Sequence, residues 1–380
     1  MNAAYRIAVI GLGQRIAHVL AAMQEVGWPL DIVGYADPSP VGAPILETAG
    51  IAKGRAFASA DALLAAGPFD LVMIGSPNHL HLEHLTLARA KGFPIFIEKP
   101  IVRTESESFE LARTLDNTPS VYIGLVMRSM PIVRETMKRV REGQVGRVVS
   151  IDATEHLHPE HGGYLARNWR RKQKWGGSYF LDKVCHDFDI FNVIAGARAQ
   201  SVASFGGRSI FQENNTARPV AYDYQEAGWS GTGDAFTSDM DVTDHQVALV
   251  EYANGVRLSF HSNTNTALME RRWYVAGTEG TLIADLVRNR LMVRRIGDAT
   301  KPERIDFGER TADLHNGADQ AMARDLRAAL DGVAAFPVTP RESLEAGLVV
   351  MAIDHAMAKC QVVDCTPMWA QFDQALAHVR

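Results

Sequence analysis

The sequence predicts an α/β protein with an N-terminal Rossmann dinucleotide-binding domain and a C-terminal α/β domain built on an open, mostly antiparallel sheet. Over the first third of the chain, short apolar segments alternate with helical segments, which predicts a parallel sheet with right-handed crossovers. The first apolar segment leads into a glycine turn. Beyond about residue 145 the apolar segments become longer and alternate in polarity, which is typical of antiparallel strands.

Length and composition predict two domains in a soluble globular protein. The chain has 380 residues, more than a single core usually supports, and we place the domains at 1–125 and 126–380, with C-terminal helices that could pack back on the first domain. The net charge of −5 argues against nucleic acid as the main partner. No segment reaches membrane-spanning length, and three cysteines without zinc-type spacing fit a reducing compartment, so we expect free thiols and a cytoplasmic location.

The first strand, Ile7 to Ile10, is followed by "GLGQR" and a helix. Gly11 and Gly13 would permit a tight turn and a close approach to a pyrophosphate, although a plain strand-to-helix turn would carry the same residues. Asp37 closes the second strand about 24 residues after Gly13, near the spacing at which an acid accepts from adenosine ribose hydroxyls. An acid there would repel a 2′-phosphate, so NAD is favoured over NADP. Ile16 stands where a third glycine is usual, and should push the helix outward or be absorbed by Ala17.

The alternation continues through predicted helices at 59–66, 81–90 and 106–115 and predicted strands at 70–78, 94–100 and 121–127. Pro77 and Asn78 close one of these strands, and Lys99 closes the next, held extended by the following proline. The carboxyl ends of parallel strands share one crevice where ligands bind, so these residues should lie together. The alternatives are a helix N-cap for Asn78 and an ordinary solvated charge for Lys99.

In the second half, "GGSYFLDKVCHDFDIFNVIAG" predicts a helix with two faces. An apolar stripe would pack on the sheet, while Asp182, His186 and Asp189 cluster on nearly the opposite face. Asp182 and His186 are four residues apart and can form a hydrogen bond that raises the basicity of the imidazole. The alternative is a polar surface histidine paired with a helix acid. Beyond this helix, the sequence also predicts a hairpin through Asn254 and Gly255.

The motifs "GLGQR", "SPNHLHLEH", "EKP", "GQVGRVV", "GGSYFLDKVCHDFD" and "VAGTEGTL" resemble those of the Gfo/Idh/MocA oxidoreductases. The resemblance implies that Lys99, Asp182 and His186 are catalytic, that the Lys99–Pro100 bond is often cis, and that the second-domain sheet forms a homodimer or homotetramer interface. It implies cofactor contacts from Gly11, Gly13, Gln14, Arg15, Asp37, Ser76, Pro77, Asn78, His81, Glu98 and Lys99. It implies substrate contacts from Arg128, Trp169, Arg170 and His186.

The expected function is an NAD(P)-dependent oxidoreductase that transfers hydride between a secondary hydroxyl of a sugar, cyclitol or glycoside and nicotinamide. His186, poised by Asp182, would take the hydroxyl proton while Lys99 donates a hydrogen bond to the oxygen. Two alternatives stay open: an NAD-dependent glycosidase with transient oxidation, and a sugar-sensing regulator without catalysis. No metal is expected, because the loop histidines His156, His158 and His161 lack helix-spaced partners. The long segment 208–239 has no clear period and could be a lid or an interface arm.

Overall fold

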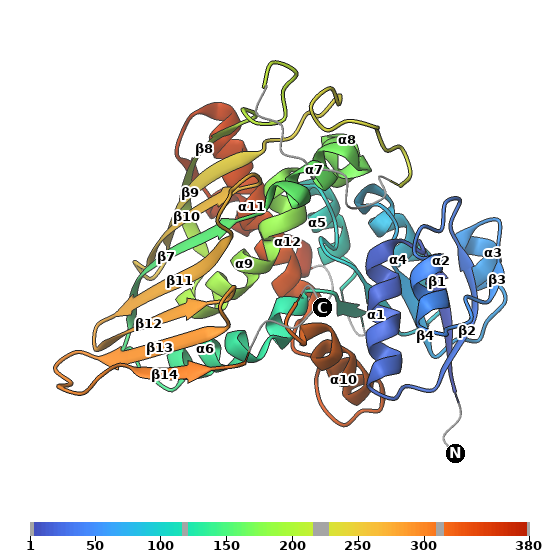
Figure 1. Ribbon diagram of the computed structural model, residues 1–380, viewed down its shortest axis with the longest axis horizontal. Helices are drawn as coiled ribbons and strands as arrows, with labels where there is room; N and C mark the ends of the chain where they lie inside the picture. The colour runs from blue at the N-terminus through green and yellow to red at the C-terminus, as the bar shows by residue number, and fades with distance from the viewer. Residues whose placement is uncertain (1–3, 116–120, 216–227, 309–314, 378–380) are drawn as a thin grey trace. The chain divides into compact units, whose positions relative to one another are not determined.

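The computed structural model describes residues 4–115, 121–215, 228–308 and 315–377 (Figure 1). It confirms the predicted fold class, with one parallel sheet and one mixed sheet. The chain forms two compact units: unit 1 comprises 1–129, 317–344 and 372–380, and unit 2 comprises 130–316 and 345–371. The later boundaries fall inside two helices, α11 (Pro340–Lys359) and α12 (Thr366–Ala377).

Unit 1 is built on a six-stranded sheet in the order β3-β2-β1-β4-β5-β6, in which every pair is parallel. The strand order reverses between β1 and β4, and this is the point at which doubly wound sheets open a ligand crevice at the carboxyl ends of their strands. The strands are short and almost wholly apolar where they are central, as expected for a sheet covered on both faces. Their bounds are β1 Tyr5–Ile10, β2 Leu30–Ala36, β3 Arg55–Ala56, β4 Leu71–Ile74, β5 Ile95–Ile97 and β6 Val121–Ile123.

Two helices of unit 1, α3 (Ala60–Leu64) and α5 (Glu105–Ala112), begin at a side-chain cap. Ser59 and Thr104 each accept a hydrogen bond from a backbone N–H in the first turn of the following helix. The predicted helix at 81–90 is confirmed at those residues. The described helices are α1 Gln14–Glu25, α2 Ala43–Thr48, α3 Ala60–Leu64, η1 Asn78–Leu80, α4 His81–Ala90, α5 Glu105–Ala112, η2 Val126–Ser129 and α10 Ala318–Leu330.

The predicted strand at 121–127 is wrong beyond Ile123. Strand β6 pairs only with β5, whose three residues Ile95–Ile97 oppose Val121–Ile123. Past that point the Gly124 N–H makes one more hydrogen bond, to the carbonyl of Ile97 at the end of β5, and the chain then turns into the 3₁₀ helix η2. The short length of the neighbouring strand β5 limits β6, and the sequence of residues 121–127 alone does not show that limit.

Unit 2 is built on a nine-stranded sheet in the order β14-β13-β12-β11-β7-β10-β9-β8-β15. Among its described strand pairs only β7–β10 is parallel, so the predicted mostly antiparallel character is confirmed. The predicted hairpin joins β9 to β10 through Asn254 and Gly255, and Gly255 adopts a φ of +83°. The strands are β7 Val148–His156, β8 Ala199–Gly207, β9 His245–Tyr252, β10 Arg257–Asn263, β11 Glu270–Gly277, β12 Gly280–Asp285, β13 Arg290–Arg295, β14 Glu303–Asp306 and β15 Val363–Asp364.

Helices α6 (Pro131–Arg141) and α9 (Tyr179–Ala195) cover one face of this sheet (Figure 1). The predicted apolar stripe of α9 is confirmed, since the rings of Phe188 and Phe191 meet Phe260 on β10 and Trp273 on β11 at centroid distances of 5.5 to 5.7 Å. Edge-to-face aromatic packing of this kind fixes the roll of the helix about its axis as well as burying area. The stripe therefore determines which way the polar residues of α9 face.

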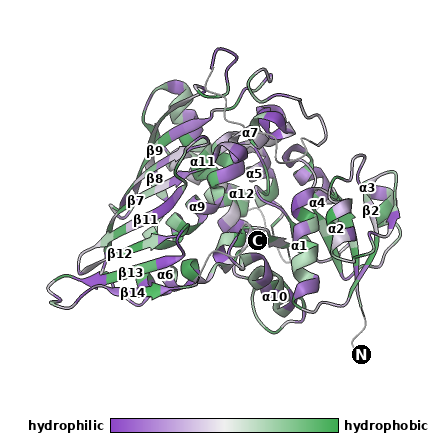
Figure 2. Cartoon of the chain, in the orientation of Figure 1, coloured by the Kyte–Doolittle hydropathy of each residue, from purple (hydrophilic) through white to green (hydrophobic). Residues whose placement is uncertain are grey.

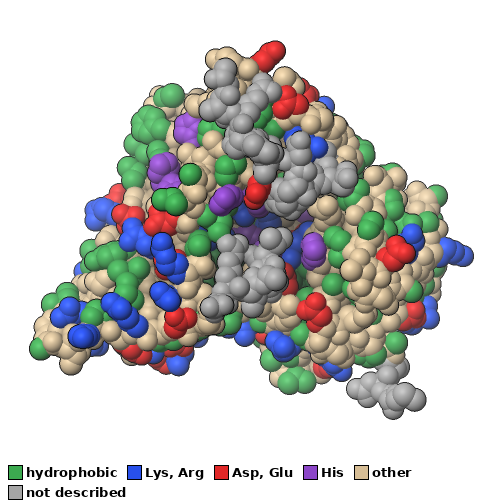
Figure 3. All heavy atoms as spheres, viewed as in Figure 1, with side chains coloured by type: hydrophobic (Ala, Val, Ile, Leu, Met, Phe, Trp, Pro, Cys, Tyr) green, Lys and Arg blue, Asp and Glu red, His purple; other side chains and the backbone are tan. Residues whose placement is uncertain are grey.

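The other face of the sheet retains exposed apolar side chains. Phe205 on β8, Leu249 on β9 and Val362 next to β15 are 69%, 60% and 70% exposed. Hydrophobic and hydrophilic residues are mixed along β12 and β13 (Figure 2), and Figure 3 shows hydrophobic and Lys or Arg side chains beside one another over β11 to β14. Among the described residues, no helix has the length and hydropathy needed to cross a membrane.

Candidate functional site

The glycine turn between β1 and α1 has the geometry predicted from the sequence. Gly11 has a φ of +81°, and a Cβ there would lie 2.3 Å from the backbone nitrogen of Ser76, so no other residue fits. Gly13 precedes the first turn of α1, which contains no acidic residue and no side-chain cap, and a Cβ on Gly13 would meet only one atom within 4 Å. Backbone N–H groups at an uncapped helix start, reached over a glycine, suit an anionic pyrophosphate.

Ile16 is accommodated in a way that the sequence analysis did not foresee. Its side chain is fully buried, and it packs over Gly75 just after β4, where a Cβ would lie 1.9 Å from the Ile16 Cγ1 atom. The glycine missing from the helix is thus replaced by a glycine on the neighbouring strand end. Ala17 instead packs toward Gly42, where a Cβ would lie 2.9 Å from the Ala17 methyl group.

The residues predicted at the carboxyl ends of β1, β2, β4 and β5 do gather at one edge of the unit 1 sheet. Asp37 directly follows β2, and its Oδ1 atom accepts a hydrogen bond from the Ser39 backbone at 2.6 Å. Partial burial raises the pKa of Asp37. Asn78 is 3% exposed and is the first residue of η1, so it does not cap α4, whose N-cap position is Leu80.

Glu98 and Arg15, both predicted to contact the cofactor, form a buried ionic group with Asp319 of α10. The Nε atom of Arg15 lies 3.1 Å from Glu98, and its terminal nitrogen lies 2.6 Å from Asp319. Burial raises the pKa of Glu98 although Arg15 opposes the shift. A Cβ on Gly124 would come within 2.9 Å of the Glu98 carboxylate, which shows how tightly this group is enclosed. Arg15 therefore links α1 to α10 through Asp319 and to the end of β5 through Glu98, and the contacts of Arg15 and Glu98 with the cofactor stay predictions.

His81 is enclosed by two loops, and its predicted contact with the cofactor stays a prediction. It is fully buried, with Nδ1 at 2.7 Å from the Pro100 carbonyl oxygen and Nε2 at 2.8 Å from the Ser76 carbonyl oxygen. The imidazole therefore bridges the loop after β4 and the loop after β5. Lys99 lies on the second of these loops, half-buried, and the Lys99–Pro100 bond is cis as the family resemblance implied. We infer that His81, through its contact with the Pro100 carbonyl oxygen, fixes the conformation of the loop that carries Lys99.

In unit 2 the start of α9 depends on the Gly176–Gly177 pair. Gly177 has a φ of +80°, and a Cβ on Gly176 would lie 3.2 Å from the backbone of Arg170 in the 3₁₀ helix η3 (Trp169–Arg171). Ser178 then caps α9, since its hydroxyl accepts from the Leu181 backbone at 2.9 Å. The end of α8 (Gln173–Gly176), directly before α9, thus lies close against η3.

Asp182 and His186 lie one turn apart on α9 and are 5% and 7% exposed. The Arg170 Nε atom lies 3.2 Å from both carboxylate oxygens of Asp182. Asp182 is therefore an ion-paired carboxylate, which sequence spacing could not show. The Asp182–His186 hydrogen bond stays a prediction that follows from their spacing on the helix.

Of the side chains predicted to line the substrate site, Trp169 and Arg170 belong to unit 2 and Arg128 belongs to unit 1. Arg170 stacks on Trp169, with the guanidinium carbon 4.1 Å from the ring centroid, and Trp169 itself is 8% exposed. Arg128 belongs to unit 1, where it lies 3.3 Å from the Glu342 carboxylate. Substrate contacts by these three residues stay predictions.

A second ionic group on α9 was missed by the sequence analysis. Arg271 of β11 pairs with Asp187 on α9 and lies 3.0 Å from Glu155 of β7, and Lys183 lies 3.7 Å from the same Glu155 carboxylate. Burial raises the pKa of Asp187 to about 6, against the opposing effect of Arg271. These ion-paired residues come from α9, β7 and β11, which are far apart in the sequence, so no local motif could predict the group. Within the described ranges, no three His, Cys, Asp or Glu side chains gather as metal ligands would.

Comparison with known proteins defines the class. Residues 5–124 match the model of an oxidoreductase family with an NAD-binding Rossmann fold, and residues 133–283 match the Gfo/Idh/MocA C-terminal domain. Together these ranges cover more than half of the chain. The chain belongs to the Gfo/Idh/MocA oxidoreductases, and its first domain is an NAD-binding Rossmann domain.

Individual relatives are distant. The chain is 24% identical over 305 residues to 1,5-anhydro-D-fructose reductase of Ensifer adhaerens, covering 78% of this chain and 81% of that protein. It is 29% identical over 151 residues to inositol 2-dehydrogenase of Corynebacterium glutamicum, covering 39% of this chain and 42% of that protein. A solved levoglucosan dehydrogenase in complex with NADH and levoglucosan has a TM-score of 0.76 at 22% identity, covering 96% and 100% of the two chains. At that identity the likeness shows a shared fold.

Proposed function

We propose that this protein is an NAD-dependent dehydrogenase that oxidises a secondary hydroxyl group of a sugar, cyclitol or glycoside, reversibly. The observation that carries the proposal is the pair of buried residues Asp182 and His186 on α9, in a chain of the NAD-binding oxidoreductase family. Relatives named inositol 2-dehydrogenase and 1,5-anhydro-D-fructose reductase support a polyhydroxylated substrate.

Each proposed residue has a distinct task. NAD, when bound, supplies the hydride acceptor. His186 accepts the hydroxyl proton as general base, and Asp182 one turn earlier orients the imidazole. Lys99 donates a hydrogen bond to the oxygen on which negative charge develops. The assignment of Lys99 and His186 to one reaction rests on the family resemblance.

The residues around the glycine turn fit a dinucleotide. Gly11 and Gly13 leave the start of α1 open to a pyrophosphate, and Asp37 at the end of β2 supplies the carboxylate for a ribose diol. A carboxylate at this position disfavours a 2′-phosphate by charge repulsion. We therefore propose NAD rather than NADP, a choice that can be tested by comparing the Kd of the two cofactors for the wild type and for Asp37→Ala.

The test of the proposed function is a substrate screen. The wild-type protein is incubated with NAD and a panel of cyclitols, aldoses and glycosides, and the absorbance of reduced nicotinamide is followed. Turnover of one compound class is expected, together with loss of turnover and nearly unchanged NAD affinity in Lys99→Met. If Lys99→Met kept turnover within a few fold of the wild type, the role given to Lys99 would be wrong. Release of a free aglycone without net NADH would instead favour the glycosidase alternative.

We further propose that the open face of the unit 2 sheet joins copies of this chain into a homodimer or homotetramer in the cytoplasm. Phe205, Leu249 and Val362 are more than half exposed there, and a groove of about 500 Å³ on the same sheet is lined by Leu249 and Val362. Apolar side chains grouped on a sheet face mark interaction surfaces. Light scattering should show an oligomer that Leu249→Glu dissociates; a wild-type monomer would refute the proposal. The cytoplasmic location is supported by the three described cysteines, Cys185, Cys360 and Cys365, which form no disulfide.

A further inference from the structure

We propose that Arg170 is a positioning residue that fixes the carboxylate of Asp182 for the base His186, an inference that rests on the proposed function. The family resemblance implies a substrate contact for Arg170. The structure assigns it a different partner, because its Nε atom lies 3.2 Å from both oxygens of Asp182.

Arg170 is held on several sides, so its guanidinium is a fixed group rather than a mobile surface cation. Its terminal nitrogen donates to the Tyr164 hydroxyl at 2.9 Å and to the Asn168 Oδ1 atom at 3.1 Å, and its plane lies over the Trp169 ring. The side chain of Arg170 is only 21% exposed and that of Asp182 only 7%. A planar guanidinium fixed by hydrogen bonds and stacking can orient a carboxylate in a way that a lysine cannot.

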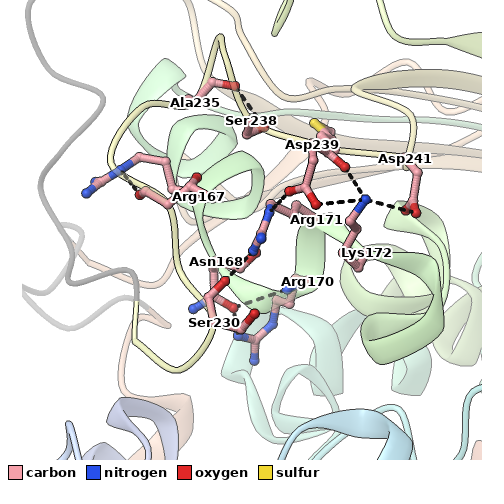
Figure 4. A network of polar contacts seen from close by, with 12 residues as sticks. Arg167, Asn168, Arg170, Arg171, Lys172, Ser230, Ala235, Ser238, Asp239 and Asp241 are labelled. Atoms are coloured by element: carbon pink, nitrogen blue, oxygen red, sulfur yellow. Dashed lines mark hydrogen bonds and ion pairs between the residues drawn. The ribbon is translucent and has the colours of Figure 1, made fainter.

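The backbone of η3 is fixed as firmly as the side chain. Gly176, at the end of α8 just before α9, allows a close approach to the Arg170 backbone, and the Asn168 side chain accepts from the Arg170 N–H at 3.3 Å. The next two residues face elsewhere, because Arg171 lies 2.6 Å from Asp239 and Lys172 lies 3.0 Å from the same carboxylate (Figure 4). The three consecutive cations therefore contact different elements. Arg170 pairs with Asp182 on α9, whereas Arg171 and Lys172 pair with the segment 228–241.

The other charged residues on and around α9 form a separate group of ion pairs. Its own charged residues besides Asp182 are Lys183, Asp187 and Asp189. Elements packed against it bring Glu155 from β7, Arg271 from β11 and Asp354 from α11, in addition to Arg170 from η3. Lys183, Asp187, Glu155 and Arg271 pair with one another. Arg170 is in ion-pair contact with Asp182, so it sets how much of the Asp182 charge reaches His186.

Loss of this cation has a definite electrostatic sign. With Arg170 present, part of the Asp182 charge is compensated, and His186 releases its proton more readily. Without Arg170, the uncompensated carboxylate would favour the imidazolium form and raise the pKa of His186. A general base must be deprotonated to act, so the acid limb of the pH profile of kcat/KM should move to higher pH.

The experiment compares Arg170→Gln, Arg170→Lys and the control Lys172→Gln, which removes a nearby ion pair that does not involve α9. For each full-length variant, the pKa of His186 is measured by NMR titration, with His186→Asn used to assign its signal, and kcat and KM are measured as functions of pH. We expect Arg170→Gln to raise the pKa of His186 by about half a unit or more and to lower kcat about tenfold, with a smaller change in KM. Arg170→Lys should keep the pKa near the wild-type value but recover only part of kcat, and Lys172→Gln should change neither.

The inference is overturned if Arg170→Gln leaves both the His186 titration and kcat at wild-type values, or if it raises KM alone, as loss of a substrate contact would. Should Arg170→Gln fail to fold, Arg170→Lys still decides, since wild-type kcat in that variant would exclude a need for the guanidinium geometry. The proposed function and the proposed role of Arg170 can be refuted independently. A protein that oxidises no sugar or cyclitol refutes the proposed function, whereas the NMR titration measures the effect of Arg170 on His186 without any substrate.

Discussion

Substitution of Gly75 by alanine tests how this Rossmann domain accommodates an isoleucine at the position of a usual glycine. The new methyl group would lie 1.9 Å from the Cγ1 atom of Ile16, far inside contact distance, and Ile16 is 0% exposed with no space to move into. Overpacking of this kind costs about 1–3 kcal/mol. Gly75 is not at a positive φ, so the backbone itself tolerates alanine and the expected cost is purely a matter of packing.

The reverse change gives the second half of the test. Ile16→Ala removes the side-chain carbon atoms that fill the space over Gly75, and a large-to-small change at a buried position costs about 2–5 kcal/mol. In the double variant the methyl group introduced at position 75 occupies part of that space, and the clash with Ile16 is gone, whereas the 3.0 Å contact with the Gly11 carbonyl oxygen stays. The double variant should therefore be less destabilised than the sum of the two single variants, by about 1–2 kcal/mol.

Urea unfolding followed by circular dichroism measures the free energy of unfolding of the four proteins in this cycle. Gly233→Ala is the matched control, because a Cβ there would meet no atom within 4 Å. That variant should lie within about 0.5 kcal/mol of the wild type. Strict additivity of Gly75→Ala and Ile16→Ala would refute the reasoning, since independent effects would mean that the two positions do not share one space.

Two further predictions concern the surroundings of α9. Burial raises the pKa of Asp354 to about 6, so the folded protein binds its proton more tightly than the unfolded chain and the free energy of unfolding should fall as pH rises from about 4 to 6. Asp354→Asn should flatten this decline, by at most about 3 kcal/mol, in urea unfolding at several pH values; an unchanged slope would contradict the assignment. Ser178→Ala removes the cap of α9 and should cost about 1 kcal/mol, whereas Ser178→Asn should restore most of it; equal stability of all three proteins would exclude a capping role.

Local patterns predicted much of the fold. The glycine turn, the helix at 81–90 and the hairpin through Asn254 and Gly255 depend on residues close together in sequence, and the structure confirms each of them. Asp182 and His186 could be placed on one helix for the same reason, since a period of 3.6 residues needs no knowledge of the rest of the chain.

The parts that sequence could not predict depend on distant partners. Glu98 was expected to meet the cofactor, but its carboxylate is paired with Arg15, which also binds Asp319 more than 200 residues later in the chain. Arg170 was predicted to meet substrate, which stays a prediction, but its ion pair with Asp182 could not be foreseen because it depends on the close approach of η3 to Gly176. In both cases the ion-pair partner was set by tertiary packing, which the local sequence does not show.

The most direct test of the proposed chemistry is the transfer of deuterium from substrate carbon to NAD. Sugars and cyclitols deuterated on their hydroxyl-bearing carbons are incubated with the wild-type protein and NAD, and the mass of the reduced nicotinamide is measured. The account predicts one added deuterium with the wild type and none above background with His186→Asn or Lys99→Met. Reduced nicotinamide without deuterium, or full transfer by both variants, would contradict it.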